Sequence, residues 1–256
     1  MKRLDQILVE QKLAPSRTQA QKMISTGRVC VVQGGVASVQ TKVSLKLPDD
    51  VLLEVREGEE QRFVSRAGLK LEGVLTRLDI QVDGLCALDV GQSTGGFTDC
   101  LLQHGIEKVV GVDVGHDQLV AKLRDDARVE CMEGINARTL ETKLFAAQGL
   151  PVSYALIVMD VSFISQTLIL PRLALLAEEG GLLISLVKPQ FEVGPEGIGK
   201  GGIVKDDSWY PKVQKGITEC LQRHHFDVID YSESVITGGD GNREFIAVAR
   251  FSPQGS

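Results

Sequence analysis

Residues 84–105 read GLCALDVGQSTGGFTDCLLQHG, and this stretch decides the fold. An apolar run ends at Val90, a glycine-rich turn follows, and a helix-like run starts near Phe97. A strand, a glycine-rich turn and a helix in this order are typical of open α/β sheets, which bind ligands beyond the carboxyl ends of their strands. Glycine lets a ligand approach the backbone closely, because it has no Cβ. The stretch therefore predicts a ligand site at the turn.

A second acidic strand end indicates what kind of ligand this is. The next strand-like run, KVVGVDVG, ends at Asp113, where a carboxylate can accept both hydroxyls of a ribose. The turn has the spacing G-x-x-x-G-G, whereas a dinucleotide-binding turn needs G-x-G-x-x-G. We therefore predict a nucleoside cofactor. The predicted contacts are Asp89, Gly91, Ser93, Gly95, Gly96 and Asp113, with Asn136 on the adenine and Glu133 as the alternative to Asn136.

Four further motifs carry charged residues suited to catalysis. They are SRAGLKL with Lys70, IVMDVSFIS with Asp160, LVKPQFE with Lys188 and GNREF with Glu244. Asp160 and Lys188 each end an apolar, strand-like run, which is where open α/β sheets place their chemistry. A single charged residue at a strand end is usually only solvated, but two such ends with flanking Gly, Pro and Asn favour a functional site.

The N-terminal part has its own pattern and its own charge. Two helices are predicted: the first from the spacing of Leu4, Ile7, Leu8 and Leu13, the second capped by Ser16 and ended by Gly27. The strand RVCVV, the turn QGG and the strand VLLEV follow. Residues 1–46 hold eight Lys and Arg against Asp5 and Glu10, a net charge of +6, which leaves −12 for the rest of a chain whose total is −6. This division predicts that the N-terminal part meets a polyanion. The candidate contacts are Arg3, Lys12, Arg17, Lys22 and Arg28.

Length and composition bound the class of protein. A chain of 256 residues that is 43% hydrophobic can bury one sizeable core and keep a small second domain. The alternation of strand-like and helix-like runs after about Leu85 predicts an α/β sheet for the larger part. The five cysteines form no CxxC pair, which argues against a disulfide framework or structural zinc and favours a reducing compartment, hence the cytoplasm. No run is apolar and long enough for a signal peptide or a membrane span.

Two resemblances appear in these motifs. The acid before the turn in D-x-G-x-x-x-G-G resembles motif I of methyltransferases, and the set Lys70, Asp160, Lys188 and Glu244 resembles the K-D-K-E tetrad of FtsJ-like ribose 2′-O-methyltransferases. The strings DVSFIS, VKPQFE, GKGGIVKD and GNREF are similar to those of the TlyA family in particular. Residues 3–35 resemble the RNA-binding domain named after the fourth small-subunit ribosomal protein. Together these similarities cover essentially the whole chain.

The resemblance implies a fold, a cofactor and a substrate. The fold would be a Rossmann-like, S-adenosyl-L-methionine-dependent methyltransferase with a small N-terminal α+β RNA-binding domain. The expected boundaries are 1–60 for the RNA-binding domain, 61–82 for a linker with the first catalytic helix, and 83–256 for the methyltransferase domain. The expected reaction is methylation of a ribose 2′-hydroxyl, of cytidine in this family, with ribosomal RNA or ribosomal subunits as the partner. The family has also been described as hemolysins.

The tetrad has a physical role in such a reaction. A 2′-hydroxyl is a poor nucleophile, so a lysine beside it can take its proton or stabilise the developing alkoxide. Lys188 is the candidate for this role, Lys70 would supply a neighbouring positive charge, and Asp160 and Glu244 would orient the two amines and the hydroxyl. No metal is expected, because the leaving group is a neutral thioether and alignment is most of the task.

Two departures and two rival functions remain at this point. Gln92 stands where relatives usually carry Ala, and His116 where they usually carry Tyr, so both put the affinity for the cofactor in question. The first rival is a hemolysin-like, membrane-active protein, which no predicted membrane span or cationic amphipathic helix supports. The second rival is a non-catalytic RNA-binding factor with a cofactor-like fold, against which the intact tetrad argues.

Overall fold

The computed structural model describes residues 1–55, 62–238 and 241–253, and it divides into two compact units. The first unit is Met1–Arg62 and the second is Phe63–Ser256. The expected boundary after residue 60 lies outside the described residues. Within the segment 61–82, the expected catalytic helix is α3 (Ala67–Arg77).

The first unit packs two helices on a small sheet. Its elements are β1 (Lys2–Arg3), α1 (Leu4–Glu10), α2 (Arg17–Ser25), β2 (Val29–Gln33), β3 (Val36–Gln40), β4 (Lys46–Leu47) and β5 (Leu52–Val55). The sheet order is β3-β2-β5, with antiparallel neighbours, and β1 pairs separately with β4. Apolar residues of both helices meet Val29, Val31 and Leu53 in one core. The predicted order of two helices, a strand, a turn and a further strand is therefore confirmed. The structure adds β3, which pairs with the central strand β2.

The two helices of this unit end for different reasons. Helix α2 begins where predicted, because Ser16 Oγ accepts a hydrogen bond from the Gln19 N–H at 3.3 Å. It ends before Gly27, whose φ of +72° is the left-handed conformation usual after a helix. The prediction that Leu13 continues the first helix is wrong. Helix α1 stops at Glu10, and Lys12 turns the chain with a φ of +59°, which leaves Leu13 36% exposed.

The second unit is a seven-stranded sheet in the order β11-β12-β10-β9-β6-β7-β8. The strands are β6 (Cys86–Val90), β7 (Lys108–Val112), β8 (Val129–Met132), β9 (Tyr154–Met159), β10 (Ala177–Val187), β11 (Phe226–Glu233) and β12 (Phe245–Phe251). The five strands from β10 to β8 pair in parallel, whereas β12 is antiparallel to both β10 and β11. This is the α/β sheet that the alternation of strands and helices predicted, in the Rossmann-like form that the resemblance implied.

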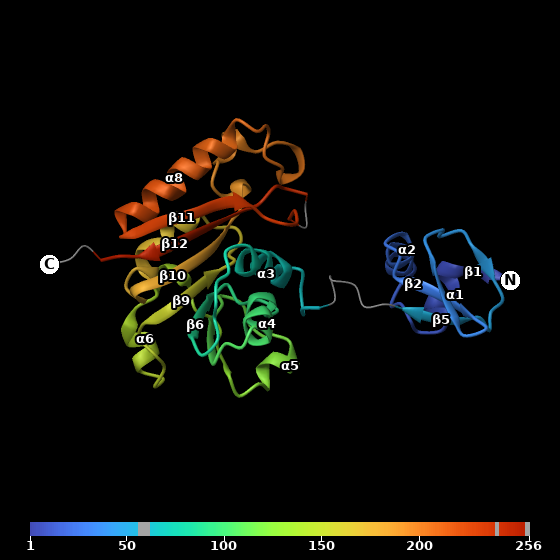
Figure 1. Ribbon diagram of the computed structural model, residues 1–256. Coiled ribbons are helices and arrows are strands. Elements are labelled where there is room, and N and C mark those ends of the chain that lie inside the picture. The colour runs from blue at the N-terminus through green and yellow to red at the C-terminus, as the bar shows by residue number, and fades with distance from the viewer. Residues whose placement is uncertain (56–61, 239–240, 254–256) are drawn as a thin grey trace. The chain divides into compact units, whose positions relative to one another are not determined.

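Helices cover both faces of this sheet. They are α3, α4 (Gly96–Gln103), α5 (Ala121–Arg124), α6 (Thr142–Ala146), α7 (Leu170–Leu173) and α8 (Trp209–Arg223). Short 3₁₀ helices join them: η2 (Ala137–Thr139), η3 (Gln166–Leu168), η4 (Pro189–Phe191), η5 (Pro195–Gly197) and η6 (Lys200–Gly202). Helices α3, α4 and α5 share one core with the sheet, and α6, α7 and α8 share the other. In Figure 1, α8 lies along β11, and α3 lies beside α4.

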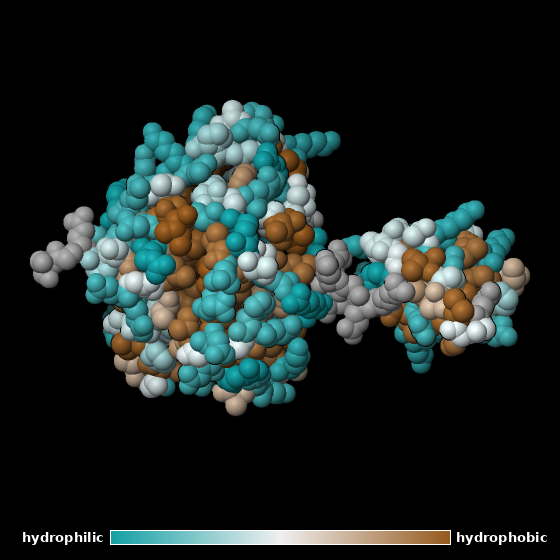
Figure 2. Space-filling view, in the orientation of Figure 1, coloured by the Kyte–Doolittle hydropathy of each residue, from teal (hydrophilic) through white to brown (hydrophobic). Residues whose placement is uncertain are grey.

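Side-chain alternation sorts the strand residues between these two cores. In β6, Leu88 and Val90 join the core of α6, α7 and α8, while Ala87 joins the core of α3 and α4. Because successive side chains of a strand point to opposite faces, Asp89 falls on the α3 and α4 face. In Figure 2, polar residues cover most of the visible face of the larger unit, and apolar residues show between them in patches.

The topology gathers the predicted site at one edge of the sheet. Parallel strands β10, β9, β6 and β7 end at the same edge, and antiparallel β12 begins there. The residues that follow the first four strands and the residue that precedes β12 are therefore neighbours. They include Lys188, Asp160, Gly91, Asp113 and Glu244. Separately, no helix within the described ranges has both the length and the apolar character needed to cross a bilayer.

Candidate active site

Two of the four predicted catalytic residues form a direct pair. Asp160 follows β9 and Lys188 follows the neighbouring strand β10. The Lys188 Nζ atom lies 2.5 Å from Asp160 Oδ1, and it donates a hydrogen bond to Ser162 Oγ at 2.9 Å. The two charged side chains are only 12% and 16% exposed. The ammonium is thus held in one orientation at the end of the sheet.

The other two form a second pair beside the first. Lys70 on α3 reaches Glu244, with Nζ and Oε2 2.5 Å apart, and both residues are buried. The register Val187↔Phe245 places Glu244 next to Lys188 across the two strands. The structure therefore brings all four residues to one place as two ion pairs. Lys70 was expected to act on Lys188 as a neighbouring positive charge, but its charge is compensated by Glu244.

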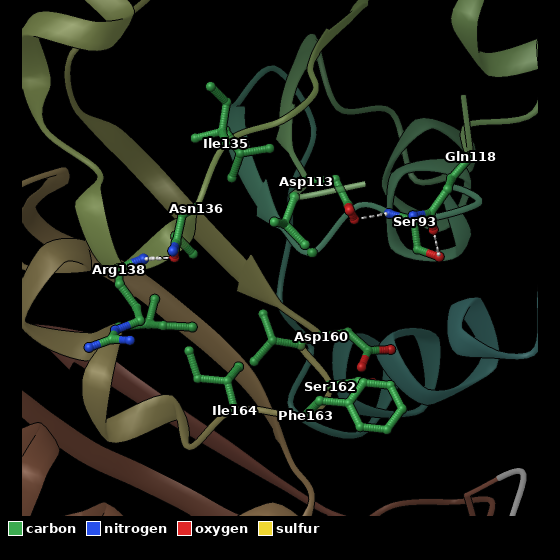
Figure 3. A pocket seen from close by; sticks show the side chains of 16 residues that line it. Ser93, Asp113, Gln118, Ile135, Asn136, Arg138, Asp160, Ser162, Phe163 and Ile164 are labelled. Carbon is green, nitrogen blue, oxygen red and sulfur yellow. Dashed lines mark hydrogen bonds between the residues drawn. The ribbon is translucent and has the colours of Figure 1, made fainter. Parts of the chain in front are cut away.

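A cavity of about 520 Å³ opens beside Asp160 and is lined by four of the predicted cofactor residues. These are Gly91, Ser93, Asp113 and Asn136. Figure 3 shows Asp113 and Ser93 on one side of the cavity and Asn136 on another, with Asp160 and Phe163 below. Its volume falls within the range of small-molecule sites. Val114, Ile135 and Ile164 give it apolar walls that suit a flat base.

Asp113 is already fixed by the backbone around it. Its Oδ2 atom accepts a hydrogen bond from the Ser93 N–H at 2.8 Å, and its Oδ1 atom accepts one from the Gly115 N–H at 2.7 Å. Each carboxylate oxygen can accept a further hydrogen bond. The carboxylate can thus join the turn to the following strand and still accept the hydroxyls of a ribose.

A smaller cavity of about 190 Å³ adjoins the first. The two share Gly91, Ser93, Asp160 and Ser162 as lining residues. The smaller one is also lined by Gly96 and by the catalytic candidate Lys188. A cofactor that occupies both would run from Asn136 to the Lys188 amine.

Gly91 is required where the two cavities meet. Its φ is +83°, and a Cβ atom there would lie 2.5 Å from the carbonyl oxygen of Asp160. A side chain at this position would therefore push apart the ends of β6 and β9. The turn glycine makes room for the catalytic strand as well as for a ligand.

Asp89 was predicted to contact the cofactor, and the structure does not bring it to either cavity as a lining residue. It is 1% exposed, on the α3 and α4 face, and its Oδ2 atom accepts a hydrogen bond from Thr98 Oγ1 at 2.7 Å. Burial raises the pKa of Asp89 to about 7. Its geometry assigns it to the support of the turn from below, by way of Thr98 on α4.

The structure also shows where Gln92 and His116, the two departures from the family pattern, lie. Gln92 is 3% exposed and donates from Nε2 to Thr98 Oγ1 at 3.0 Å, so its side chain folds beneath the turn, although Gln92 also contributes to the wall of the smaller cavity. His116 is exposed and does not line the larger cavity. Neither side chain lies across the larger cavity, where it would obstruct a cofactor.

The choice between Asn136 and Glu133 is clearer in the structure. Asn136 lines the larger cavity, and its Oδ1 atom accepts a hydrogen bond from the Arg138 N–H at 3.0 Å. Glu133 is not a lining residue; its carboxylate accepts the Asp117 N–H at 2.8 Å. Asn136 is therefore the better candidate for the adenine end.

Phe163 is a site residue that the sequence reasoning missed. It lines the larger cavity, yet it is 90% exposed and has a φ of +64°. A bulky residue with positive φ is a backbone outlier. Its ring lies 5.2 Å from that of Phe191, centroid to centroid. The only signal in the sequence was its place in DVSFIS, three residues after Asp160.

The five candidate RNA contacts lie on the first unit and differ in their surroundings. Arg3 and Arg17 both bond the buried Asp5, at 2.9 Å and 3.0 Å. Burial would raise the pKa of Asp5, but hydrogen bonds from Arg3, Gln21 and Arg17 hold it well below the usual range. Lys12 is exposed at the end of α1. Lys22 and Arg28 line one small cavity of about 100 Å³ at the end of α2.

In the described part of the chain, no group of three or more His, Cys, Asp or Glu side chains has the arrangement of a metal site.

Comparisons with known proteins agree with this geometry. The FtsJ-like methyltransferase family matches residues 63–251, and the S4 domain matches residues 2–44. A Bacillus subtilis protein named as an rRNA methyltransferase, YqxC, is 43% identical over 95% of this chain and 84% of its own length. The 16S/23S rRNA (cytidine-2′-O)-methyltransferase TlyA of Mycobacterium tuberculosis is 37% identical over 95% of this chain and 87% of its own.

A solved structure is similar over nearly the whole chain. It is a protein of Streptococcus thermophilus named as a hemolysin, with 41% identity, a TM-score of 0.72, and coverage of 98% of this chain and 88% of that one. The cofactor of this FtsJ-like methyltransferase is S-adenosylmethionine, and the residues that line the two adjoining cavities suit it. The chain is therefore a methyltransferase of the TlyA family, in which an S4 domain precedes an FtsJ-like domain.

Proposed function

We propose that this chain methylates the 2′-hydroxyl of a cytidine ribose in ribosomal RNA. The observation that carries the proposal is the Lys188–Asp160 pair, which lies where the two cofactor cavities meet. The TlyA relative that matches 95% of the chain is named for this reaction on 16S and 23S rRNA. Ribosomal subunits are then the partner, and the cytoplasm is the compartment.

S-adenosylmethionine, when bound, supplies an electrophilic methyl group. Asp113 would hold its ribose, Asn136 its adenine, and the backbone of Gly91, Ser93, Gly95 and Gly96 would shape the turn around it, with Asp89 as support from below. Every one of these residues except Asp89 and Gly95 lines one of the two cavities. These positions support the proposed division of roles.

Lys188 would handle the hydroxyl proton. Its side chain lines the smaller cavity and is oriented by Asp160 and Ser162. As an ammonium it would stabilise the alkoxide, and only as a neutral amine would it accept the proton. Glu244 lies one strand away, is 3% exposed and lines neither cavity, so it would orient the Lys70 amine. Because both pairs are nearly buried, their geometry is fixed before the substrate arrives.

Phe163 would position the target nucleotide. An exposed aromatic ring beside the cavity offers a face on which an unstacked base can lie. The first unit would supply phosphate contacts through Arg3, Lys12, Arg17, Lys22 and Arg28. Its net charge of +6 over residues 1–46 supports this role.

The test is single-turnover methylation of ribosomal subunits that lack the modification. Lys188→Ala is expected to abolish turnover and to leave the affinities for cofactor and RNA nearly unchanged, because its contribution is made in the transition state. Lys188→Arg is not expected to restore activity, since a guanidinium stays protonated. Substantial activity of the Arg variant would contradict the role of Lys188 as a base.

Each of the two rival functions predicts a result that the proposed function does not. A hemolysin-like protein would lyse cells, and lysis would survive Asp160→Ala. A non-catalytic RNA-binding factor would bind ribosomal RNA but would show no binding of S-adenosylmethionine by calorimetry. Either result, together with unmethylated RNA after incubation with the wild type, would replace the proposed function.

A further inference from the structure

Glu192 joins the two loops that carry the catalytic pair. It follows the short helix η4 after Lys188. Its Oε2 atom accepts a hydrogen bond from Ser165 Oγ at 2.6 Å, and its Oε1 atom accepts one from the Gln166 N–H at 2.9 Å. Ser165 and Gln166 lie at the end of the loop that begins with Asp160. One carboxylate thus ties the loop after β10 to the loop after β9.

The connection continues into the sheet. The Gln166 side chain is 2% exposed, and its Oε1 atom accepts a hydrogen bond from Ser185 Oγ at 2.5 Å. Ser185 lies in β10, three residues before Lys188, and is fully buried. The loop after β9 is therefore held at two points, by Glu192 and by the strand that carries Lys188.

Stability alone does not explain a carboxylate at this place. Within the described residues Glu192 forms no ion pair, and burial raises its pKa. Glu192 is half-buried, and a partly buried charge without an opposite charge costs free energy even when it is hydrogen-bonded, a cost that an apolar residue would avoid. Ser165 and Gln166 need an acceptor here, and a carboxylate offers two oxygens at once.

The two loops that Glu192 joins also meet through a pair of aromatic residues. Phe163 belongs to the loop after β9 and Phe191 to the loop after β10, and their rings are 5.2 Å apart. Phe191 directly precedes Glu192, and Phe163 lies two residues before Ser165. A change in the Glu192 bonds would therefore move Phe163 and Asp160 relative to Lys188.

We propose that Glu192 is a positioning residue, whose carboxylate fixes the loop of Asp160 and Phe163 against Lys188 in the catalytic geometry. This inference rests on the proposed methyl transfer. It adds a residue that touches neither substrate nor cofactor in the assigned roles and that acts through the two loops.

Three full-length variants test the role. Glu192→Ala removes both bonds. Glu192→Gln keeps them, because its amide oxygen can accept from the Gln166 N–H, its amide N–H can donate to Ser165 Oγ, and that hydroxyl can turn to Thr167 Oγ1, which is 2.7 Å away. Glu196→Ala is the matched control, because it removes an exposed carboxylate from the same loop region.

Single-turnover methylation of ribosomal subunits and amide hydrogen exchange are measured together. Glu192→Ala is expected to lower the maximal rate about 100-fold, the size of effect that a displacement of roughly 1 Å causes, with little change in the half-saturating RNA concentration. Exchange in residues 162–168 is expected to accelerate. Glu192→Gln is expected to restore both properties to near the wild type, and Glu196→Ala to match the wild type.

The outcomes separate this inference from the proposed function. A wild type that methylates no ribosomal RNA would remove the proposed function, whereas faster exchange in Glu192→Ala alone would still show the tie between the loops. A normal maximal rate in Glu192→Ala would overturn the positioning role. A rate loss that Glu192→Gln does not recover would overturn it as well, because it would show that the charge rather than the two bonds is needed.

Discussion

Gln92 and Gly111 fit together beneath the cofactor turn, and a pair of substitutions would show how tightly. A Cβ atom built on Gly111 lies 2.0 Å from Gln92 Cδ, 2.1 Å from its Oε1 and 2.2 Å from its Nε2. Gln92 is 3% exposed, and the open space beside its side chain is the smaller cavity, whose wall it helps to form. Gly111→Ala must therefore push the Gln92 side chain toward that cavity or displace β7 or the turn.

The magnitudes follow from these contacts. Overpacking of a buried site costs about 1–3 kcal/mol, which is the expected loss of unfolding free energy in Gly111→Ala. Gln92→Ala loses the hydrogen bond to Thr98 Oγ1, worth about 1 kcal/mol, as well as packing over Gly111. In the double variant the new methyl group enters the space that the glutamine has left. We expect the double variant to be more stable than the sum of the single effects predicts, by about 1–3 kcal/mol.

Urea unfolding with and without S-adenosylmethionine is the assay. The midpoint gives the stability, and an unchanged dependence on urea shows that the unfolded state is the same. Since Gly91 lines both cavities and precedes Gln92, Gly111→Ala is also expected to weaken cofactor binding, and Gln92→Ala in the same chain to recover it. Effects that add within about 0.5 kcal/mol would refute the fit.

Three more predictions concern single sites. Asp113→Ala is expected to weaken S-adenosylmethionine binding, measured by calorimetry, at least about tenfold, since a hydrogen bond to a charged group contributes roughly 1.5–3 kcal/mol. Asp117→Ala, at an exposed position, is the control, and equal affinities of wild type and Asp113→Ala would contradict the ribose contact. Burial raises the pKa of Asp89 from 3.8 to about 7, so the folded state holds this proton to higher pH than the unfolded state does, and the unfolding free energy of the wild type should fall between about pH 4 and pH 7. The unfolding free energy of Asp89→Asn should lack this decrease, and equal pH dependence in the two proteins would contradict the raised pKa. Replacing Arg17 and Lys22 by Ala should reduce the slope of log K for RNA binding against log salt concentration by about 0.7–0.9 per lost phosphate contact. Thermal unfolding is the control, because Arg17 also bonds Asp5, and an unchanged slope would show that neither residue contacts a phosphate.

The sequence predicted the features that depend on local pattern. The glycine turn, the strand ends at Asp113, Asp160 and Lys188, and the cap at Ser16 each need only a short stretch of chain. The fold class followed from the alternation of strands and helices. These signals are local because periodicity and turn chemistry are local.

Other features depend on contacts between distant parts of the chain. Lys70 and Glu244 are 174 residues apart, so their pairing follows from the antiparallel entry of β12 and not from either motif. The burial of Asp89 beneath the turn follows from the face of the sheet on which its side chain falls. The exposure of Phe163 depends on its positive φ, which the residue type does not predict. The end of α1 at Glu10, followed by the positive φ of Lys12, was missed for the same reason.

Strand β12 has a consequence for the moment at which the protein becomes competent during its own synthesis. It lies between β10 and β11 in the sheet, yet it comes after both in the sequence. A nascent chain that has released β6 to β11 can form the parallel part of the sheet, but β11 has no neighbour to pair with, and Lys70 has no Glu244 to meet. The second ion pair closes only when residues 245–251 have left the ribosome that makes them. With the proposed role of Glu244, catalysis on ribosomal RNA must therefore wait until β12 has been synthesised.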